Sequence, residues 1–351
     1  MAGGIGSRFW PKSRTNHPKQ FLDILHIGRT LIQSTFDRFL KFIPLENIFI
    51  VTSEQYRELV MQQLPEIFPQ NILCEPSRKN TAPCIAYVSY KIREINPEAN
   101  LICSPADHIV TDVDSFKNIC LEVLNFTDNI KALVTLGIKP TNPNTGYGYI
   151  QYDQPAVTEN IYKVKTFTEK PDLQLAKTFL ASGDFLWNAG IFVWKVKSII
   201  KAFENFLPEI HELFDSEKAN LNSADEKNAI ERIYPQCVNI SIDYGVMEKA
   251  DNVYVMPSAF GWSDLGTWAS AYDNLDKDYF GNAVAGDHVI VIDATKNMVH
   301  AENKKLILLQ GLDDFIVVDT HDVLLICKKD KEQEIKNYVA EVKRNKGEKF
   351  L

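Results

Sequence analysis

The chain contains 351 residues, of which 45% are hydrophobic and 24% are charged, and its formal net charge at pH 7 is −8. These values are typical of folded globular proteins, and the length predicts one large domain plus a smaller one. The acidic balance argues against a general nucleic-acid surface, and no apolar run is long enough to span a membrane or act as a signal peptide. Six scattered cysteines form no CxxC pair, which favours buried thiols in the cytoplasm over disulfides or a zinc site.

Short apolar strands alternate with helical patterns over the first part of the chain. Strands are predicted at residues 47–52, 71–74, 100–104 and 132–138, and helices at 54–64 and 84–95. This alternation predicts an α/β fold with a Rossmann-like, mostly parallel mixed sheet and helices on both faces. In such sheets ligands bind beyond the carboxyl ends of the strands, so polar motifs that directly follow strands are the first candidates for function.

An antiparallel section is predicted next, and a small β-rich domain at the end of the chain. Strands are expected at 146–150, 162–168 and 191–194, and helices at 172–182, 197–214 and 225–234. Five short strands follow at 288–294, 298–301, 305–310, 315–320 and 323–328, and then a basic helix at 331–346. We therefore expect a catalytic domain over residues 1–282 and a small β domain, with the spacing of a solenoid fragment and a terminal helix, over residues 283–351.

The chain opens with a glycine-rich loop that contains Gly3, Gly4 and Gly6 and is followed by Arg8. Three glycines within four residues let backbone N–H groups turn toward one anion, and a guanidinium adds a fork for phosphate oxygens. Lys19 is a second cation that could reach the same phosphates. A flexible tail would explain the glycines alone equally well. The spacing matches neither a Walker loop nor the dinucleotide fingerprint, which argues against P-loop enzymes and dehydrogenases.

Two aspartates lie in motifs that suit a magnesium site. Asp107 follows a predicted strand within Pro-Ala-Asp-His, and Asp264 lies in the glycine-bounded loop Gly-Trp-Ser-Asp-Leu-Gly. Mg²⁺ is typically held by one or two carboxylates together with substrate phosphates. Taken alone, Asp107 is more commonly a helix N-cap and Asp264 a turn residue.

Four further segments hold groups suited to sugar hydroxyls and a phosphate. Gly148 allows close approach of the backbone, Glu169 and Lys170 pair a carboxylate with an ammonium, and Asn188 and Asp243 add an amide and a carboxylate. Each has a simpler explanation when taken alone: a strand bulge, a surface ion pair, or a turn residue.

The polar loop after the second predicted strand suits the edge of a guanine base. Guanine offers acceptors at O6 and N7 and donors at N1 and the 2-amino group, and Glu75, Asn80 and Thr81 supply complementary groups. A plain polar loop that caps the next helix is the alternative. The individual roles of Arg78 and Lys79 stay open.

Seven of these motifs, in order, resemble the sugar-nucleotide pyrophosphorylases. Gly-Gly-x-Gly-Ser-Arg-x-Trp-Pro and the later Pro-Lys-Gln-Phe carry the resemblance, and the Trp-Pro form is similar to the mannose-1-phosphate guanylyltransferase branch. The resemblance implies a nucleotide-diphospho-sugar transferase fold, and it is compatible with a left-handed β-helix-like domain at the end of the chain. It also implies transfer of GMP from GTP to mannose 1-phosphate, with Mg²⁺, to give GDP-mannose and pyrophosphate.

The resemblance also assigns site residues. The metal ligands would be Asp107 and Asp264. The catalytic residues would be Arg8, Lys19, Asp107, Lys170 and Asp264. The nucleotide would contact Ala2, Gly3, Gly4, Gly6, Ser7, Arg8, Lys19, Glu75, Asn80 and Thr81, and the sugar phosphate Gly148, Glu169, Lys170, Asn188 and Asp243. A homodimer is expected, with neither nucleic acid nor membrane as a partner.

One departure and several alternatives accompany this interpretation. In the family a buried strand leads into the glycine-rich loop, whereas here only Met1 and Ala2 precede it. A central strand is therefore expected to lack most of its length, so that either the natural start lies further upstream or the protein is impaired. The alternatives are a heptose 1-phosphate guanylyltransferase, a glucose 1-phosphate thymidylyl- or uridylyltransferase, and a non-catalytic nucleotide-sugar sensor.

Overall fold

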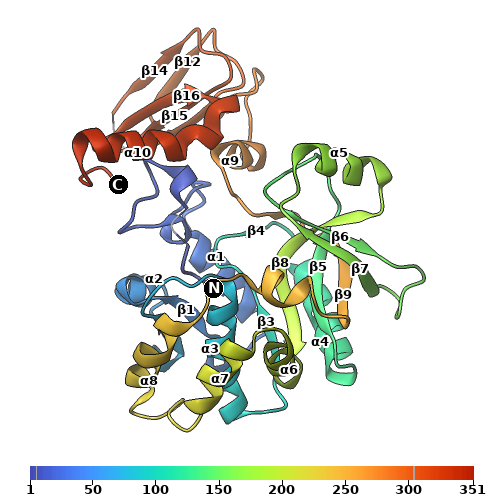
Figure 1. Cartoon of the computed structure of the whole chain (residues 1–351). Coiled ribbons are helices and arrows are strands. Elements are labelled where there is room, and N and C mark those ends of the chain that lie inside the picture. The colour runs from blue at the N-terminus through green and yellow to red at the C-terminus, as the bar shows by residue number, and fades with distance from the viewer. Residues whose placement is uncertain (5, 303–304) are drawn as a thin grey trace.

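The computed structural model describes residues 1–4, 6–302 and 305–351, and its main sheet has six strands in the order β3-β8-β5-β9-β7-β6 (Figure 1). These strands are β3 (Asn100–Cys103), β5 (Leu133–Ile138), β6 (Gly148–Tyr152), β7 (Tyr162–Glu169), β8 (Phe185–Lys195) and β9 (Val253–Ser258). β3, β5 and β9 run in one direction, and β8 lies antiparallel between β3 and β5. The predicted α/β class and mixed sheet are confirmed. The sheet is not mostly parallel, however: among its described strands only β5 and β9 pair in parallel, because β8 and the β6–β7 hairpin pair antiparallel with their neighbours.

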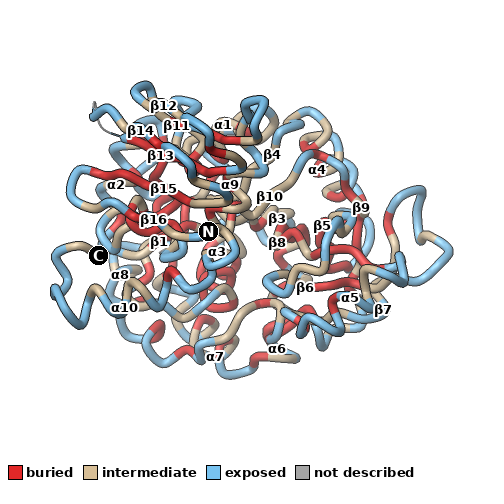
Figure 2. Tube along the Cα trace, turned by 90° about the horizontal axis from the view of Figure 1, so that it is seen from above, coloured by how far each residue is buried: buried red, intermediate tan, exposed pale blue. Residues whose placement is uncertain are grey.

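Helices cover both faces of this sheet, because successive strand residues point to opposite sides. Val134 and Val193 pack against Phe116 of α4 on one face, and Leu133 and Trp194 belong to a cluster with α3 and α6 on the other. The helices are α1 (Leu31–Leu40), α2 (Arg57–Gln63), α3 (Thr81–Ile95), α4 (Val113–Asn129), α5 (Leu173–Ser182), α6 (Val196–Phe206), α7 (Pro208–Ser216), α8 (Glu226–Ile233), α9 (Trp268–Asn274) and α10 (Ile335–Lys346). Figure 2 shows burial concentrated along the central strands, whereas the loop between β6 and β7 is exposed.

A separate two-stranded parallel sheet, β1 (Ile50–Ser53) and β2 (Ile72–Glu75), completes the α/β part. The start of the chain lies between this sheet and β3. The amino group of Met1 donates to the Ser104 carbonyl at 2.9 Å, and the Ala106 N–H donates to the Met1 carbonyl at 2.9 Å. On the other side, the Ala2 N–H donates to the Val51 carbonyl at 2.7 Å. Met1 and Ala2 thus occupy the position at which a strand leading into the glycine-rich loop was expected.

A cavity of about 540 Å³ lies between β1 and β3, behind Met1. No strand of the described residues pairs with the facing edges of β1 and β3. Apolar side chains of α1 and α3 line the cavity: Ile32, Phe36, Phe39, Ile85, Val88 and Ile92. We call this cavity the interstrand slot.

The C-terminal part contains two parallel stacks of strands, β11-β13-β15 and β12-β14, with β16 antiparallel to β15. The strands are β11 (Ala283–Ala285), β12 (Val289–Ile292), β13 (Met298–Ala301), β14 (Ile307–Gln310), β15 (Phe315–Asp319) and β16 (Leu324–Lys328). Helix α10 packs on one stack through Ile335, which contacts the cluster of Met298 and Ile316. The predicted solenoid-like β part with a terminal helix is confirmed.

The segment after the glycine-rich loop is held against this C-terminal part, and Figure 1 shows it beside α10. The Trp10 indole N–H donates to the Phe350 carbonyl at 2.7 Å. Arg14 forms an ion pair with Asp322 at 2.6 Å, and Lys12 with Glu302 at 3.0 Å. The C-terminal strands therefore fix one side of the loop that was predicted to bind phosphates.

Some predicted boundaries differ from the structure for physical reasons. The helix expected at 197–214 is divided into α6 and α7, because Pro208 cannot donate the hydrogen bond that would continue α6. The strand expected at 191–194 is the end of the longer β8. All six cysteines are free thiols. Among the described helices, none combines the length and the apolar composition that a membrane crossing requires.

Candidate functional site

The glycine-rich loop is fixed at both ends and exposed in the middle. The Ala2 carbonyl accepts hydrogen bonds from the Gln20 amide at 2.8 Å and the Thr52 hydroxyl at 2.9 Å. Gly4, Ser7 and Arg8 are exposed, whereas the following Phe9 and Trp10 are buried in a cluster with the C-terminal part. The backbone of Gly4 and Ser7 and the guanidinium of Arg8 are therefore accessible to solvent, while the ends of the loop are held in place.

Gly6 brings this loop against Lys19. Its φ angle of 67° lies in the left-handed region, and a Cβ atom at this position would lie 2.3 Å from Lys19 Cβ. Only glycine fits such an approach without displacing Lys19. The predicted loop residues Gly3, Gly4 and Gly6 thus lie together, next to the predicted second cation.

Lys19 joins the two predicted aspartates. Its side-chain nitrogen lies 3.0 Å from Asp107 Oδ2 and 2.7 Å from the main-chain oxygen of Asp264, and the residue is only 4% exposed. Burial alone would raise the pKa of Asp107, but the Lys19 ammonium holds that pKa below its usual value. Asp107 is therefore ionised at neutral pH.

A short antiparallel ribbon explains why two aspartates far apart in the sequence meet. β4 (Ile109–Val110) begins two residues after Asp107, and β10 (Trp262–Ser263) ends directly before Asp264. Ser263 pairs with Ile109, which brings the two aspartate-bearing motifs to the same end of the ribbon. The Trp262 indole N–H also donates to His108 Nδ1 at 3.2 Å. Burial lowers the pKa of His108, so this imidazole is neutral and helps to hold the two motifs together.

The predicted sugar residues gather at one end of β6, β7 and β8. Gly148 is the register partner of Glu169, and a Cβ atom at position 148 would lie 2.4 Å from Glu169 Oε2. The Asn188 amide donates to Asp243 Oδ1 at 2.8 Å, while its own oxygen accepts from the Thr135 hydroxyl at 2.8 Å. Burial, with the nearby Glu169 carboxylate, raises the pKa of Asp243 to about 6. This pocket offers two carboxylates and an amide in close proximity.

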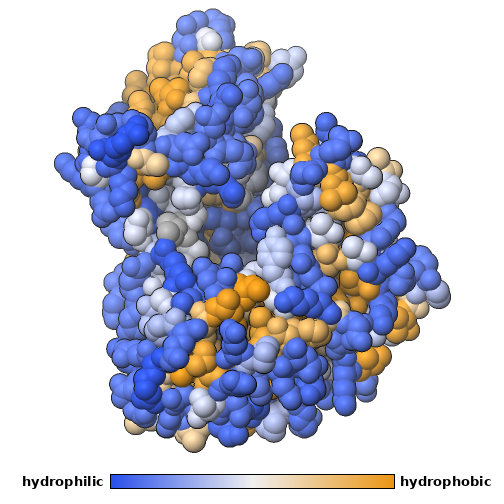
Figure 3. All heavy atoms as spheres, in the orientation of Figure 1, coloured by the Kyte–Doolittle hydropathy of each residue, from blue (hydrophilic) through white to orange (hydrophobic). Residues whose placement is uncertain are grey.

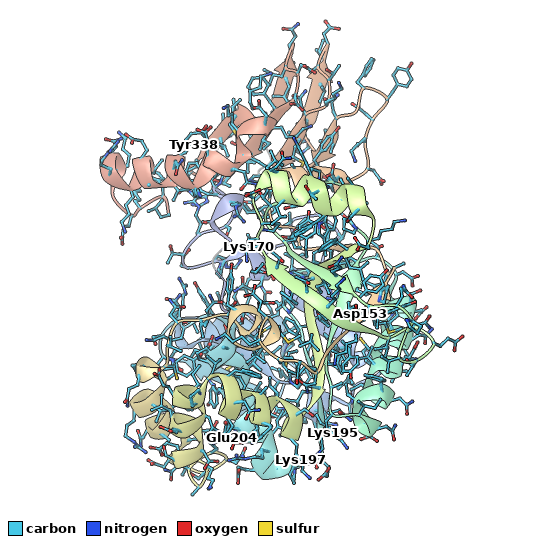
Figure 4. The ribbon with its side chains drawn as sticks, turned by 45° about the vertical axis from the view of Figure 1, so that its right-hand side comes forward. Asp153, Lys170, Lys195, Lys197, Glu204 and Tyr338 are labelled. Carbon is cyan, nitrogen blue, oxygen red and sulfur yellow. The ribbon has the colours of Figure 1, made fainter. Side chains whose placement is uncertain are left out.

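Lys170 is the exposed member of this group and forms an ion pair with Glu169. Burial would lower the pKa of Lys170, but the bond to Glu169 raises it above its ordinary value. Figure 4 shows Lys170 at the end of the α/β part that faces α10, while Lys195, Lys197 and Glu204 lie at the opposite end. Figure 3 shows that this face of the molecule is hollowed between the C-terminal part and the α/β part.

Two of the three predicted base-reading side chains, Glu75 and Thr81, are buried or partly buried. Glu75 is 6% exposed and bonded to the Tyr234 hydroxyl, and burial raises its pKa to about 7. The Thr81 hydroxyl accepts from the Ile242 N–H at 2.8 Å. Asn80 is exposed and caps α3 through a bond to the Thr81 N–H at 2.9 Å. Of these three candidates, Asn80 has the most accessible side chain.

The two residues whose roles stayed open have structural partners. The Arg78 guanidinium donates to the Tyr56 hydroxyl at 2.8 Å, and Lys79 donates to the Pro235 carbonyl at 2.7 Å. Both contacts connect the loop to neighbouring short helical segments, Glu54–Tyr56 and Tyr234–Gln236.

Tyr147 has no role in the sequence-based prediction, yet it lies between the aspartates and the sugar pocket. Its hydroxyl donates to Asp264 Oδ1 at 2.6 Å, and its ring packs edge-on against Trp187 and Trp262. In the sequence, Tyr147 is recognisable only as a tyrosine between two glycines. Sequence periodicity could not show that its hydroxyl contacts a residue 117 positions further along the chain.

Family models match almost the whole chain. Residues 1–279 match the model described as "Nucleotidyl transferase", and residues 287–342 match "MannoseP isomerase/GMP-like beta-helix domain". The chain is 34% identical over 347 residues to a mannose-1-phosphate guanylyltransferase of Escherichia coli, covering 97% of this chain and 74% of the relative. It is 36% identical over 351 residues to another of Salmonella montevideo, covering 98% and 73%.

One solved structure has nearly the same extent and shape. A Thermus thermophilus protein described as "mannose-1-phosphate geranyltransferase" superposes with a TM-score of 0.89 at 29% identity. The match covers 98% of each chain. The similarity therefore includes both the α/β part and the C-terminal strands.

Proposed function

The chain belongs to the mannose-1-phosphate guanylyltransferase family of nucleotidyl transferases, and we propose that it transfers GMP from GTP to α-D-mannose 1-phosphate, with Mg²⁺. The products would be GDP-mannose and pyrophosphate. The observation that supports this best is the meeting of Asp107, Asp264 and Lys19 beside the glycine-rich loop.

The sugar's phosphate oxygen would attack the α-phosphorus of GTP in line, and pyrophosphate would leave. The nucleophile is already anionic, so the reaction requires no general base. Catalysis then consists of positioning and charge neutralisation. The backbone of the glycine-rich loop, with Arg8 and Lys19, would hold the triphosphate.

The residues present fit a magnesium ion. Two aspartates lie beside the same end of the ribbon, and Mg²⁺ prefers hard oxygen ligands with near-octahedral geometry completed by phosphates and water. No group of three or more His, Cys, Asp or Glu side chains suited to a metal occurs within residues 1–4, 6–302 and 305–351, which argues against a closed protein cage. Asp107 and Asp264 would hold Mg²⁺, which when bound neutralises charge on the phosphates.

The sugar would lie against Gly148, with hydroxyls bonded to Glu169, Asn188 and Asp243. Lys170 would orient the 1-phosphate, since it is the exposed cation at that edge. Glu75, Asn80 and Thr81 would contact the nucleotide, with Asn80 nearest to solvent.

Pyrophosphate release with each of the four nucleoside triphosphates and mannose 1-phosphate tests the proposal. We expect GTP to be preferred, whereas preference for UTP or dTTP with glucose 1-phosphate would replace it with the uridylyl- or thymidylyltransferase alternative. Heptose 1-phosphate is assayed in parallel. Binding of GDP-mannose without any pyrophosphate release would favour a sensor.

A single substitution tests the metal assignment. Asp107→Asn is expected to lower turnover by about 10²–10³-fold, because it removes charge at the reacting phosphates while the amide keeps the side-chain shape. The control is Asp114→Asn at an exposed position on α4. A near-normal rate in Asp107→Asn would exclude its role as a metal ligand.

We also propose a division between catalytic and β domains at residues 282–283 and a homodimer. Exposed apolar side chains on the β part support an interface there: Ile290 and Ile292 on β12, and Leu308 on β14. Light scattering of the chain and of an Ile290→Lys, Leu308→Lys variant tests this. A monomer at micromolar concentration in the unsubstituted chain would exclude it.

A further inference from the structure

Tyr147 lies directly before β6 and contacts both halves of the candidate site. Its hydroxyl donates to Asp264 Oδ1 at 2.6 Å, and its main-chain oxygen accepts from the Lys170 N–H at 3.2 Å. One residue thus contacts a proposed metal ligand through its side chain and the proposed phosphate-binding lysine through its backbone.

The contact to Asp264 fixes how that carboxylate is rotated. Oδ1 also accepts the Gly266 N–H at 3.0 Å, so this oxygen has two donors. Within the described part of the chain, Oδ2 forms no hydrogen bond, and it is the oxygen left to face a ligand. A carboxylate with one oxygen held in this way presents the other in one direction.

The aromatic ring of Tyr147 is fixed by packing rather than by its hydroxyl. Its centroid lies 5.0 Å from that of Trp187 and 5.3 Å from that of Trp262, both edge-on. Such pairs contribute about 0.5–1.5 kcal/mol each beyond burial.

We propose that Tyr147 is a positioning residue, whose hydroxyl holds Asp264 Oδ1 so that Oδ2 is directed to the catalytic cation. This rests on the proposed function, because it takes Asp264 to be a metal ligand. Tyr147 does not contact the reacting atoms; it acts through Asp264. Its backbone bond to Lys170 keeps the sugar phosphate in a constant relation to the same carboxylate.

Tyr147→Phe isolates the hydroxyl, because phenylalanine retains the ring contacts with both tryptophans. The matched control is Tyr149→Phe, since the Tyr149 hydroxyl donates to the Asn144 carbonyl at 3.0 Å and interacts with Trp187, and within the described residues it bonds to neither aspartate. Mn²⁺ binding is measured by electron paramagnetic resonance on the full chain, with GTP present and sugar phosphate absent. The Mg²⁺ dependence of turnover is measured on the same proteins.

We expect Mn²⁺ to bind about tenfold more weakly to Tyr147→Phe, with an unchanged affinity in Tyr149→Phe and little change in the melting temperature of either. The Mg²⁺ concentration for half-maximal turnover should rise by a similar factor, and saturating Mg²⁺ should restore most of the rate. A purely structural role would lower the melting temperature without moving the metal affinity.

Two results would overturn the proposal, and they are distinguishable. Equal Mn²⁺ affinity in the unsubstituted chain and in Tyr147→Phe would show that the hydroxyl does not position Asp264, while the metal site itself would still be supported. No Mn²⁺ binding by the unsubstituted chain removes the metal site itself, and this inference with it.

Discussion

Gly6 and Lys19 lie in direct contact: a Cβ atom at position 6 would lie 2.3 Å from Lys19 Cβ. This contact places a buried ammonium directly beneath the glycine-rich loop and next to Asp107. The phosphate loop and the carboxylates are therefore parts of one packed unit.

Gly6→Ala is expected to weaken GTP binding by about tenfold or more, because the methyl group displaces Lys19 as well as straining the backbone. Gly28→Ala is the control, since Gly28 has a similar φ of 77° but open space where the Cβ would lie. Nucleotide binding and thermal melting are measured for both. Equal effects on GTP binding would mean that only backbone strain, and not the contact with Lys19, matters.

Gly148→Ala is expected to raise the KM for mannose 1-phosphate about tenfold and to leave the KM for GTP nearly unchanged. The added methyl group would lie 2.4 Å from Glu169 Oε2 and would push this carboxylate out of the sugar pocket. Gly146→Ala, where the new atom meets the half-buried Asn144 side chain at 3.1 Å, is the control. Steady-state kinetics with each substrate varied separately tests the assignment, and a selective change in the GTP constant would contradict it.

Asp243 makes stability depend on pH in a defined window. Its pKa of about 6 in the folded chain exceeds the ordinary value of 3.8, so the folded state binds more protons between about pH 4 and 6. The stability that Asp243 contributes therefore falls as pH rises through this window and is constant above it. Asp243→Asn should be more stable than the unsubstituted chain at pH 7, by on the order of 2 kcal/mol.

Urea unfolding between about pH 4.5 and 8 measures this difference, and Asp153→Asn in the exposed loop after β6 is the control. The advantage of Asp243→Asn is expected to grow up to about pH 6 and then stay level. A difference independent of pH would show that the carboxyl does not titrate in this range.

Because the interstrand slot is lined by apolar side chains and open strand edges, extending the chain before Met1 is expected to change its thermal stability. A segment of about five apolar residues placed before Met1 would pair with the open edges of β1 and β3 and fill the space between α1 and α3. We expect the melting temperature to rise by several degrees, while a glycine-serine segment of equal length has no effect. Equal melting temperatures for both extended chains would contradict pairing in the slot.

The sequence predicted those elements whose patterns are local. Most strands of the main sheet followed apolar runs, and the glycine-rich loop, Asp107 and Asp264 followed from short motifs that the structure brings together. β9 was not predicted; it contains Pro257, which is unusual in a strand with neighbours on both sides. Its proline lies near the strand end, where β7 no longer pairs with it.

α4 was not predicted either, although its apolar residues Phe116, Cys120 and Val123 and its cap Asp112 form a local helical pattern. Other features lie beyond local patterns. The ribbon of β4 and β10 has two residues in each strand, too few for any periodicity. The contact between Tyr147 and Asp264 depends on that ribbon, so it required the folded chain.

The interstrand slot also bears on how the site is held together. The glycine-rich loop stands beside the β1–β2 sheet, and the sugar pocket stands on the six-stranded sheet, and among the described strands no ladder crosses from one to the other. Helix packing, the backbone bonds of Met1 and Ala2, and side-chain bonds such as the Lys19–Asp107 ion pair link the two sheets across this seam. A sugar nucleotide would touch both sides at once. Product binding would therefore act as a clamp across the seam, and product release would require the two halves of the site to part.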